Sequence, residues 1–309
     1  MSGTGMEGTG GVSGHKIVAV IPAYNEERFI GSVVLKARQY ADAVVVVDDG
    51  STDATGEIAE AAGAIVVRHE HNLGKGVALN TAFHKVLELA PDVVVTLDGD
   101  AQHLPAEVSN VAGPVLRDEA DIVVGSRYLR RTHATPRHRV LGHWAMTLLT
   151  NLISGIRLTD SQSGFRAFSP RAIQAISFRS IGFSVESEMQ FLAREHNLRV
   201  VEVPVTIRYK DKPKRPAVAH GMAVLNGVLR LIGQYRPLLF FGVPGMLALL
   251  IGLAWGAWVV DLYRRFQGLA LGYAMISVLL TILGAMTLST GIILHSIRGL
   301  LLELLGSKR

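Results

Sequence analysis

Short apolar runs alternate with amphipathic stretches along the first two thirds of the chain. The runs are rich in valine and isoleucine, which is typical of buried strands, and the stretches between them repeat at helical spacing. This alternation predicts an α/β fold with a mostly parallel sheet covered by helices on both faces. The expected strands are 17–21, 44–47, 65–67, 93–97, 122–124 and 200–206, and the expected helices end near residues 40, 89 and 117.

The C-terminal third contains two long apolar segments. Residues 238–260 carry no charge, and a helix of that length would measure ~35 Å, enough to cross a hydrocarbon core of ~30 Å. Residues 268–297 form a second segment, interrupted only by His295 near its end. The pattern predicts a two-helix transmembrane hairpin, and the alternative is a buried helical hairpin in a soluble protein.

Basic residues flank this hairpin unequally. Arg264 and Arg265 lie in the turn between the two segments, whereas the basic residues outside the hairpin are Arg230, Arg236, Arg298, Lys308 and Arg309. Such an excess predicts a multi-pass membrane protein whose N-terminal domain and C-terminus are both cytoplasmic.

The composition of the chain predicts its division into domains. Residues 1–14 are rich in glycine, serine and threonine and are expected to be a disordered tail. Residues 15–217 should form the α/β domain, and residues 218–236 an amphipathic helix at the bilayer surface. The two transmembrane helices and a short tail account for residues 237–309.

Acidic residues collect where the predicted strands end. Glu26, the Asp48–Asp49 pair and the Asp98–Gly99–Asp100 segment each follow a different strand. Because the carboxyl ends of parallel strands lie at one edge of a sheet, these acids should face a common crevice, where open α/β sheets bind ligands.

The Asp98–Gly99–Asp100 segment is the strongest candidate for chemistry. We expect Gly99 to let the backbone bend, so that Asp98 and Asp100 converge with Gln102 nearby. Two carboxylates and an amide suit Mg²⁺ or Mn²⁺, which keep further positions for water and substrate phosphate. The alternative is an ordinary strand-end turn with solvated acids.

Overall composition and charge narrow the class of partner. The chain contains no cysteine, which excludes disulfides, thiolate metal sites and a cysteine nucleophile. The net charge of +5 favours anionic partners such as nucleotide phosphates or acidic lipid headgroups. No basic stripe is interleaved with aromatic residues, so nucleic acid is not expected as a partner.

Six segments give the chain a family resemblance over residues 16–220. They read VIPAYNEE, VVVVDDGSTD, NLGKGVALNTAF, TLDGDAQH, VVGSRY and DSQSGFRAF, in that order. This set resembles glycosyltransferase family 2, and more narrowly the polyprenyl-phosphate sugar synthases such as dolichyl-phosphate glucosyl- and mannosyltransferases. The resemblance implies a GT-A type nucleotide-binding fold in front of the transmembrane hairpin.

The resemblance also implies roles for individual residues. Asp98, Asp100 and Gln102 would hold the metal, with Asp100, Arg127 and Asp160 as catalytic residues. Arg127 would grip the acceptor phosphate, for which a guanidinium is suited. Arg139, in a basic stretch expected to be a loop, and Glu188 are further acceptor-side candidates, and Glu186 lies close enough to be confused with Glu188. The expected donor nucleotide site comprises Pro22, Tyr24, Glu26, Asp49, Lys75, Asp98, Arg208 and Lys214.

The implied reaction is an inverting transfer of a hexose to dolichyl or undecaprenyl phosphate. The KGVALNTAF and DSQSGFR segments are more similar to the glucosyltransferase branch, so UDP-glucose or UDP-N-acetylglucosamine is the expected donor. GDP-mannose is the alternative donor, and an inactive sugar-nucleotide-binding membrane scaffold is the alternative of another class. The expected partners are therefore a sugar nucleotide, a polyprenyl phosphate and the lipid bilayer, and a homo-oligomer is possible.

Overall fold

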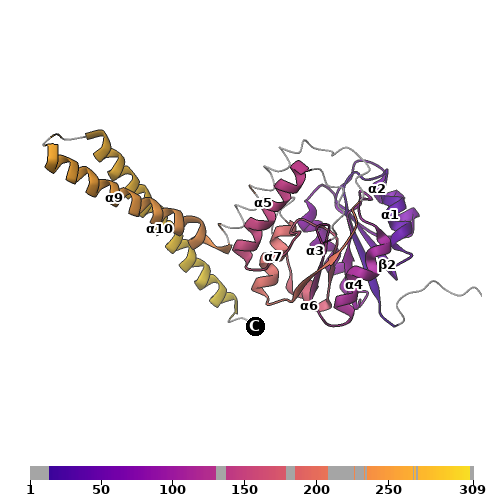
Figure 1. Ribbon diagram of the computed structural model, residues 1–309. Helices are drawn as coiled ribbons and strands as arrows, with labels where there is room; N and C mark the ends of the chain where they lie inside the picture. Colours follow the sequence, from indigo (N-terminus) through magenta and orange to yellow (C-terminus); the bar gives the residue numbers. More distant parts are fainter. Residues whose placement is uncertain are drawn as a thin grey trace, which may run out of the picture. The chain divides into compact units, whose positions relative to one another are not determined.

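The computed structural model describes residues 14–129, 137–178, 185–207, 226, 233, 235–266, 268 and 271–306, and the side chains of all of these except 137–142 and 301–306. The chain forms two compact units, Met1–Val228 and Leu229–Arg309. The first contains a sheet flanked by helices and the second a helical hairpin (Figure 1). The expected boundary at residue 217 and most of the expected interface helix 218–236 lie outside the described residues, and the whole division into domains stays a prediction.

The first unit is built on a seven-stranded sheet in the order β3-β2-β1-β4-β6-β5-β7. Valine-rich runs form its centre, because strands buried on both faces have no need of alternating polar residues. All neighbouring strands are parallel except at β6, which runs antiparallel to both β4 and β5. The strands are β1 (Ile17–Ala23), β2 (Ala43–Asp48), β3 (Ile65–Arg68), β4 (Val93–Thr96), β5 (Ile122–Ser126), β6 (Arg166–Phe168) and β7 (Val200–Pro204).

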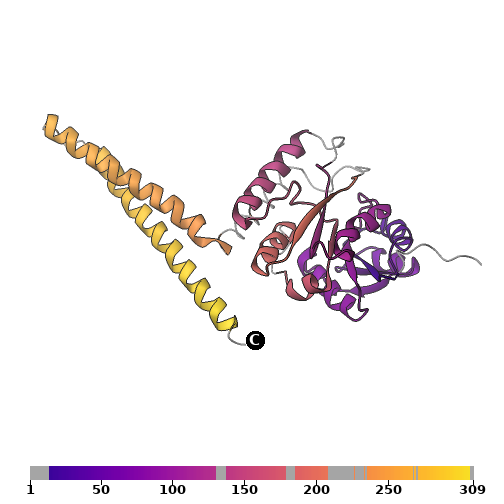
Figure 2. The same ribbon diagram turned by 60° about the horizontal axis from the view of Figure 1, so that its bottom comes forward.

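Helices flank the sheet on both sides, as Figures 1 and 2 show. The apolar sides of α1 and α4 pack on β1 and β4, and side chains such as Ile21, Val34, Val95 and Val111 are fully buried there. The helices are α1 (Ile30–Ala37), α2 (Thr55–Ala61), α3 (Lys75–Leu87), α4 (Val108–Leu116, after the 3₁₀ turn Pro105–Glu107), α5 (Arg137–Ser154), α6 (Pro170–Ala175) and α7 (Val185–Glu195).

Strand β6 decides the geometry of the site, and the sequence pattern does not predict it. It is three residues long and begins with an arginine, so it carries no strand signature. Arg166 pairs with Thr96 of β4 and also with Val124 of β5. Because β6 is antiparallel, its first residue lies at the carboxyl edge of β4. The preceding loop, residues 160–165, is thereby brought beside the Asp98–Asp100 segment.

Two further expectations need correction. The expected loop around Arg139 is a helix from Arg137 onward, because α5 begins there. Gly99 is not in the left-handed region of backbone space, whereas Ala101 has φ 59°. The tight turn of this segment is therefore made at Ala101, after Asp100, and it brings Gln102 back onto Asp100.

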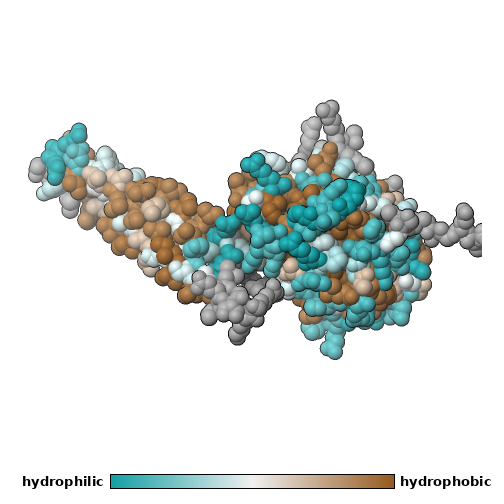
Figure 3. All heavy atoms as spheres, turned by 90° about the horizontal axis from the view of Figure 1, so that it is seen from below, coloured by the Kyte–Doolittle hydropathy of each residue, from teal (hydrophilic) through white to brown (hydrophobic). Residues whose placement is uncertain are grey.

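The second unit is an antiparallel hairpin of α9 (Val243–Phe266), preceded by the π-helical turn Leu238–Gly242, and α10 (Leu271–Gly306). Leu238–Phe266 and Leu271–Leu300 are long and apolar enough to cross a membrane, and only 17% of the most apolar stretch of each is buried. That exposure is the opposite of what a core helix shows. Figure 3 shows hydrophobic residues over most of the hairpin face in view, and hydrophilic residues at its turn.

Small residues hold the two helices of the hairpin close together. A Cβ added to Gly245 would lie 2.4 Å from the backbone of Leu288, and one added to Gly284 would lie 2.3 Å from that of Leu249. The Ser277 hydroxyl donates to the Gly252 carbonyl at 2.8 Å. Close backbone approach and hydroxyl hydrogen bonds are how helices associate in lipid, where apolar burial gives no driving force.

Candidate active site

Three charged side chains from three elements meet at the carboxyl end of β4. The Nζ of Lys75 lies 2.6 Å from Oδ1 of Asp98 and 2.7 Å from Oε1 of Glu186. Lys75 is the first residue of α3, and Glu186 is the second residue of α7. Burial alone would lower the pKa of Lys75, but the two carboxylates raise it above its usual value. Lys75 is therefore a fixed cation that joins the sheet to α7.

The two acids of the Asp98–Gly99–Asp100 segment differ in pKa. Burial opposes ionisation of Asp98, but the positive charge of Lys75 and its hydrogen bond outweigh burial and lower the pKa of Asp98 to about 2. Burial, the charge of Asp98 and that of Glu26 together raise the pKa of Asp100 to about 6. Asp98 is thus a permanent anion, and Asp100 is an acid crowded by like charges that a cation would relieve.

Asp100 and Gln102 form a local turn. The backbone N–H of Gln102 donates to Oδ1 of Asp100 at 3.1 Å, and its side-chain Nε2 donates to Oδ2 at 2.6 Å. Asp100 and Gln102, two of the three expected metal ligands, are therefore held side by side.

His103 supports this segment, although no role for it was predicted from the sequence. Its Nδ1 accepts the backbone N–H of Asp98 at 3.2 Å, and its ring stacks on Phe165 with centroids 5.1 Å apart. Burial lowers the pKa of His103 to about 4, so the ring is neutral and can accept that bond. The only sequence signal was its place directly after the acidic motif.

Gly164 allows the DSQSGFR loop to approach the acids. A Cβ at this position would lie 2.7 Å from Oδ2 of Asp98 and 3.0 Å from Nζ of Lys75. A side chain would have to displace one of these groups, so the glycine is required by close packing. Gly99 is less constrained, since an added Cβ would meet Glu26 at 3.4 Å, an ordinary contact distance.

Arg127 and Asp160 form an ion pair at the carboxyl end of β5. The Nε of Arg127 lies 2.5 Å from Oδ2 of Asp160, and the backbone N–H of Arg127 donates to the same oxygen at 3.2 Å. Asp160 is fully buried, and among the described residues its Oδ1 has no hydrogen-bond partner. Glu202 of β7 accepts from the backbone N–H groups of Thr159 and Asp160, which fixes this loop.

Arg166, in the same motif, is a buried structural cation. Its Nε donates to the carbonyl of Ser163, and its Nη2 donates to the carbonyls of Ser161 and Glu186. These bonds tie the loop before β6 to the start of α7. The arginine therefore sets where Glu186 stands relative to Asp98.

The expected nucleotide-side residues occupy the ends of β1 and β2. Tyr24 is 43% exposed, Pro22 is half-buried in β1, and the side chain of Glu26 packs on Gly99. Asp49 is buried and already engaged. Its carboxylate lies 2.7 Å from His69 Nδ1 and accepts the backbone N–H groups of Leu73 and Gly74. Asp49 thus holds the turn that leads into Lys75, and its contact with a base stays a prediction.

Glu186 and Glu188, which the sequence alone could not tell apart, have different surroundings in the structure. Glu186 faces Lys75 and Asp98, whereas Glu188 is fully buried in α7. The Arg139 side chain lies outside the described residues, as do Arg208 and Lys214 altogether. Their expected roles remain predictions.

The donor set at Asp98 and Asp100 fits a divalent cation. Both carboxylates and the Gln102 amide belong to one turn, and the crowding of charge at Asp100 is what a cation would relieve. Among the described residues, no group of three or more His, Cys, Asp or Glu side chains could hold a metal. A divalent cation held by Asp98, Asp100 and Gln102 would have positions left for water and a diphosphate, as Mg²⁺ commonly requires.

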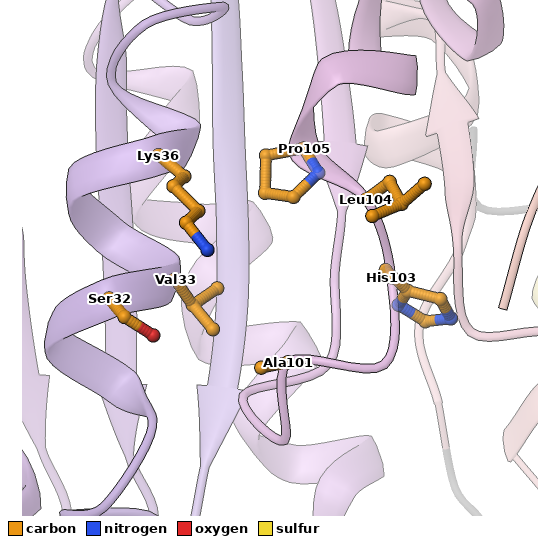
Figure 4. A pocket seen from close by; sticks show the side chains of 7 residues that line it. All are labelled: Ser32, Val33, Lys36, Ala101, His103, Leu104 and Pro105. Atoms are coloured by element: carbon orange, nitrogen blue, oxygen red, sulfur yellow. The ribbon is translucent and has the colours of Figure 1, made fainter. Parts of the chain in front are cut away.

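A small cavity lies behind this turn, between α1 and the segment that follows Asp100. Figure 4 shows the Lys36 side chain pointing into the gap opposite Pro105. Its remaining lining residues are Ser32, Val33, Ala101, His103 and Leu104. The cavity borders the segment that follows Asp100 on the side of α1.

Comparison with known proteins identifies the family. Residues 18–179 match the model of "Glycosyl transferase family 2". The chain is 34% identical over 234 residues to the UDP-N-acetylglucosamine–dolichyl-phosphate N-acetylglucosaminyltransferase of Methanococcus voltae, covering 68% of this chain and 91% of the relative. It is 32% identical over 228 residues to the undecaprenyl-phosphate mannosyltransferase of Micrococcus luteus, covering 68% and 92%.

A solved structure gives the same fold. Glucosyl-3-phosphoglycerate synthase from Mycobacterium tuberculosis, crystallised with Mn²⁺, UDP and glucosyl-3-phosphoglycerate, has a TM-score of 0.58 and 26% identity, covering 72% of this chain and 81% of that one. The mostly parallel sheet with its acidic segment at the end of β4 is thus of the GT-A type. Fold, motif order and relatives agree, and the chain belongs to glycosyl transferase family 2.

Proposed function

We propose that this protein transfers a hexose from a UDP-sugar to a polyprenyl phosphate. The observation that carries the proposal is the pairing of two polar sites at one sheet edge. Asp98 and Asp100 follow β4, Arg127 and Asp160 stand at the end of β5, and the short strand β6 lies between them. One site suits a metal-bound diphosphate and the other a second phosphate.

The names of the relatives support a lipid phosphate as the acceptor. The relative from Methanococcus voltae is named for dolichyl phosphate and that from Micrococcus luteus for undecaprenyl phosphate. Two helices able to cross a membrane would keep the catalytic unit where such a lipid resides. We further propose that this unit and the C-terminus face the cytoplasm, where sugar nucleotides are made.

The chemistry requires little of the protein beyond positioning. A phosphate monoester has a second pKa of about 6, so the acceptor is largely dianionic at neutral pH and needs no strong general base. One of its oxygens forms a bond to the anomeric carbon while the bond from that carbon to the diphosphate oxygen breaks. The electron pair leaves with UDP, and attack from the opposite face inverts the anomeric centre.

Each charged residue then has a defined task. Lys75 keeps Asp98 ionised and in place, and the Arg127 guanidinium, held by Asp160, binds the acceptor phosphate. A divalent cation at Asp98, Asp100 and Gln102 would neutralise charge that develops on the departing diphosphate. We propose Pro22, Tyr24, Glu26 and Asp49 as the walls of the nucleotide pocket, Arg208 and Lys214 as diphosphate ligands, and Arg139 and Glu188 as further acceptor-side residues.

The identity of the sugar nucleotide is the most specific part of the proposal. The solved relative was crystallised with UDP, and one curated relative is named for UDP-N-acetylglucosamine. These support a uridine nucleotide, with UDP-glucose placed ahead of UDP-N-acetylglucosamine. The relative named as a mannosyltransferase supports GDP-mannose as the second candidate.

A panel of radiolabelled donors with polyprenyl phosphate, followed by thin-layer separation of the lipid product, tests the reaction. We expect label to enter the lipid from UDP-glucose or UDP-N-acetylglucosamine. Calorimetric titration with UDP and with GDP in the presence of Mn²⁺ tests the identity of the base. A pocket that forms hydrogen bonds with one base leaves its polar groups unpaired with the other base and binds it poorly. Tighter GDP binding favours the mannose reaction, and donor binding without transfer to any lipid favours an inactive scaffold.

A further inference from the structure

His69 is a nearly buried histidine that joins the carboxylate of Asp49 to α3. It follows β3, and its side chain is 10% exposed. Its Nδ1 lies 2.7 Å from Oδ1 of Asp49, and its Nε2 lies 3.0 Å from the hydroxyl of Thr81 in α3. An ionised carboxylate only accepts hydrogen bonds, so Nδ1 is the donor in the first contact. The imidazole is therefore held with both of its nitrogens engaged.

The carboxylate of Asp49 has one acceptor position left among the described residues. A carboxylate offers about four lone pairs, two on each oxygen. Oδ1 accepts from His69 Nδ1 and from the backbone N–H of Leu73 at 3.0 Å, which fills both of its positions. Oδ2 accepts the backbone N–H of Gly74 at 2.8 Å, which leaves its second position open. Without His69, the carboxylate would have one open position on each oxygen.

Asp49 lies where the base of the donor nucleotide is expected. Its backbone N–H donates to the carbonyl of Ala23 at 2.8 Å, which places it beside the exposed Tyr24 at the end of β1. The segment after β3 packs directly on the turn that follows Asp49, because a Cβ added to Gly50 would lie 2.3 Å from the backbone of His71. The carboxylate is thus fixed between the end of β1 and this segment.

The two candidate bases differ in the number of hydrogen-bond donors on their pairing edge. Uracil has one N–H there, at N3. Guanine has two adjacent donors, N1–H and the 2-amino group, and a carboxylate pairs with both by using one oxygen for each. A carboxylate with one open position therefore matches uracil. Guanine would leave one donor without a partner in the pocket, which lowers its affinity.

We propose that His69 sets the preference of the nucleotide pocket for uridine over guanosine nucleotides. It occupies the position on Asp49 Oδ1 that the second donor of guanine would need. His69 acts through Asp49, so it determines specificity without taking part in the chemistry. The inference rests on the proposed function for the place of the nucleotide pocket, and it concerns the binding of the nucleotide and not the transfer of the sugar.

Two substitutions separate the hydrogen bond from the packing of the ring. His69→Phe keeps a ring and removes the donor, which opens a position on Asp49 Oδ1. His69→Asn loses the ring and keeps an N–H donor near the place of Nδ1. UDP and GDP affinities are measured by calorimetry with Mn²⁺ on the full-length protein in detergent. We expect His69→Phe to lower the ratio of UDP to GDP affinity at least about tenfold, as for one hydrogen bond to a charged group. His69→Asn should keep the wild-type ratio.

A matched control and a third nucleotide sharpen this test. His84→Phe, at an exposed position of α3, should leave both affinities unchanged. Inosine diphosphate has the N1–H of guanine but lacks the 2-amino group. His69→Phe should therefore raise the affinity for GDP about tenfold more than that for inosine diphosphate. Equal gains for the two would show that the substitution only enlarges the pocket, and they would overturn the proposal. An equal loss of UDP and GDP affinity would show that His69 only supports the fold, and it would overturn the proposal as well.

The wild-type protein provides a test that needs no substitution. Because it has no position for the 2-amino group, it should bind GDP no more tightly than inosine diphosphate, and it should bind UDP more tightly than either. Tighter binding of GDP than of either other nucleotide contradicts the role of His69. Transfer assays separate this role from the proposed function. If the wild type prefers UDP and His69→Phe loses that preference, but no label enters a lipid, base selection by His69 stands and the transfer to polyprenyl phosphate fails.

Discussion

The Nε of Arg127 lies 2.5 Å from Oδ2 of Asp160, whose carboxylate is fully buried. Removing either partner would leave a buried charge without compensation, which is costly. An alanine variant of Arg127 would therefore combine a folding defect with any loss of phosphate binding. A test of Arg127 as the acceptor ligand has to keep its charge.

Arg127→Lys keeps the charge but loses the planar, multi-donor guanidinium. We expect the KM for polyprenyl phosphate to rise about ten- to a hundredfold, because a hydrogen bond to a charged group is worth roughly 1.5–3 kcal/mol. Donor affinity, measured by calorimetry, should change much less. Arg117→Lys is the control, because Arg117 pairs with Glu119 on the exposed surface. Collapse of donor affinity with unchanged use of acceptor would show that Arg127 belongs to the donor site.

Asp100→Asn tests the metal site. We expect transfer to be lost and Mn²⁺ affinity, followed by calorimetry, to fall, because a neutral amide replaces one of two carboxylate ligands. The circular dichroism spectrum should not change. Asp118→Asn, at a side chain 91% exposed, is the control. Full activity of the Asp100 variant, or of the wild type in excess chelator, would contradict the metal role.

Two glycines at the site should respond differently to alanine. In Gly164→Ala the new methyl group would displace Asp98 or Lys75, so we expect at least about a tenfold loss of transfer, the equivalent of 1.4 kcal/mol. Gly99→Ala should be tolerated far better, since its methyl group makes ordinary contacts. Steady-state transfer rates of the two variants, measured side by side, test this difference. Equal losses of rate would show that the conformational freedom of the glycine backbone matters more than the room around the added methyl group.

The Lys75–Glu186 pair should show coupling in stability. Lys75→Met leaves two carboxylates facing each other. Breaking a fully buried pair costs about 3–5 kcal/mol, and the partial exposure of this site places the expected loss below that range. Lys75→Met/Glu186→Gln should recover at least about 0.5 kcal/mol of it. Denaturant unfolding of the full chain measures both, with Lys85→Met at an exposed pair as the control. Strictly additive effects would mean that the pair is not coupled.

The absence of cysteine makes the membrane topology directly testable. A cysteine introduced at Gly268, in the turn of the hairpin, should react with an impermeant thiol reagent only from outside the cell. One introduced at Ser32, on α1 of the catalytic unit, should react only after the membrane is opened. Labelling of the Gly268 position only from the cytoplasm would overturn the proposed orientation.

The sequence by itself determined the strands at the centre of the sheet and the two apolar helices. Both are set by local patterns: valine-rich runs such as Val93–Thr96 are typical of buried strands, and charge-free segments of this length suit lipid. It also placed Asp98, Asp100 and Gln102 together, because they are neighbours in the chain and directly follow a strand.

Tertiary structure alone decided which distant residues join this segment. Strand β6 is too short to show a period, and only the fold reveals that it lies between β4 and β5 and pairs antiparallel with both. That strand brings Gly164 against Asp98, and the packing of α3 and α7 places Lys75 between Asp98 and Glu186. The exposure of Trp144, Leu148 and Leu152 on α5 is equally invisible in the sequence, because a helical period shows that two faces differ but not which face the protein covers.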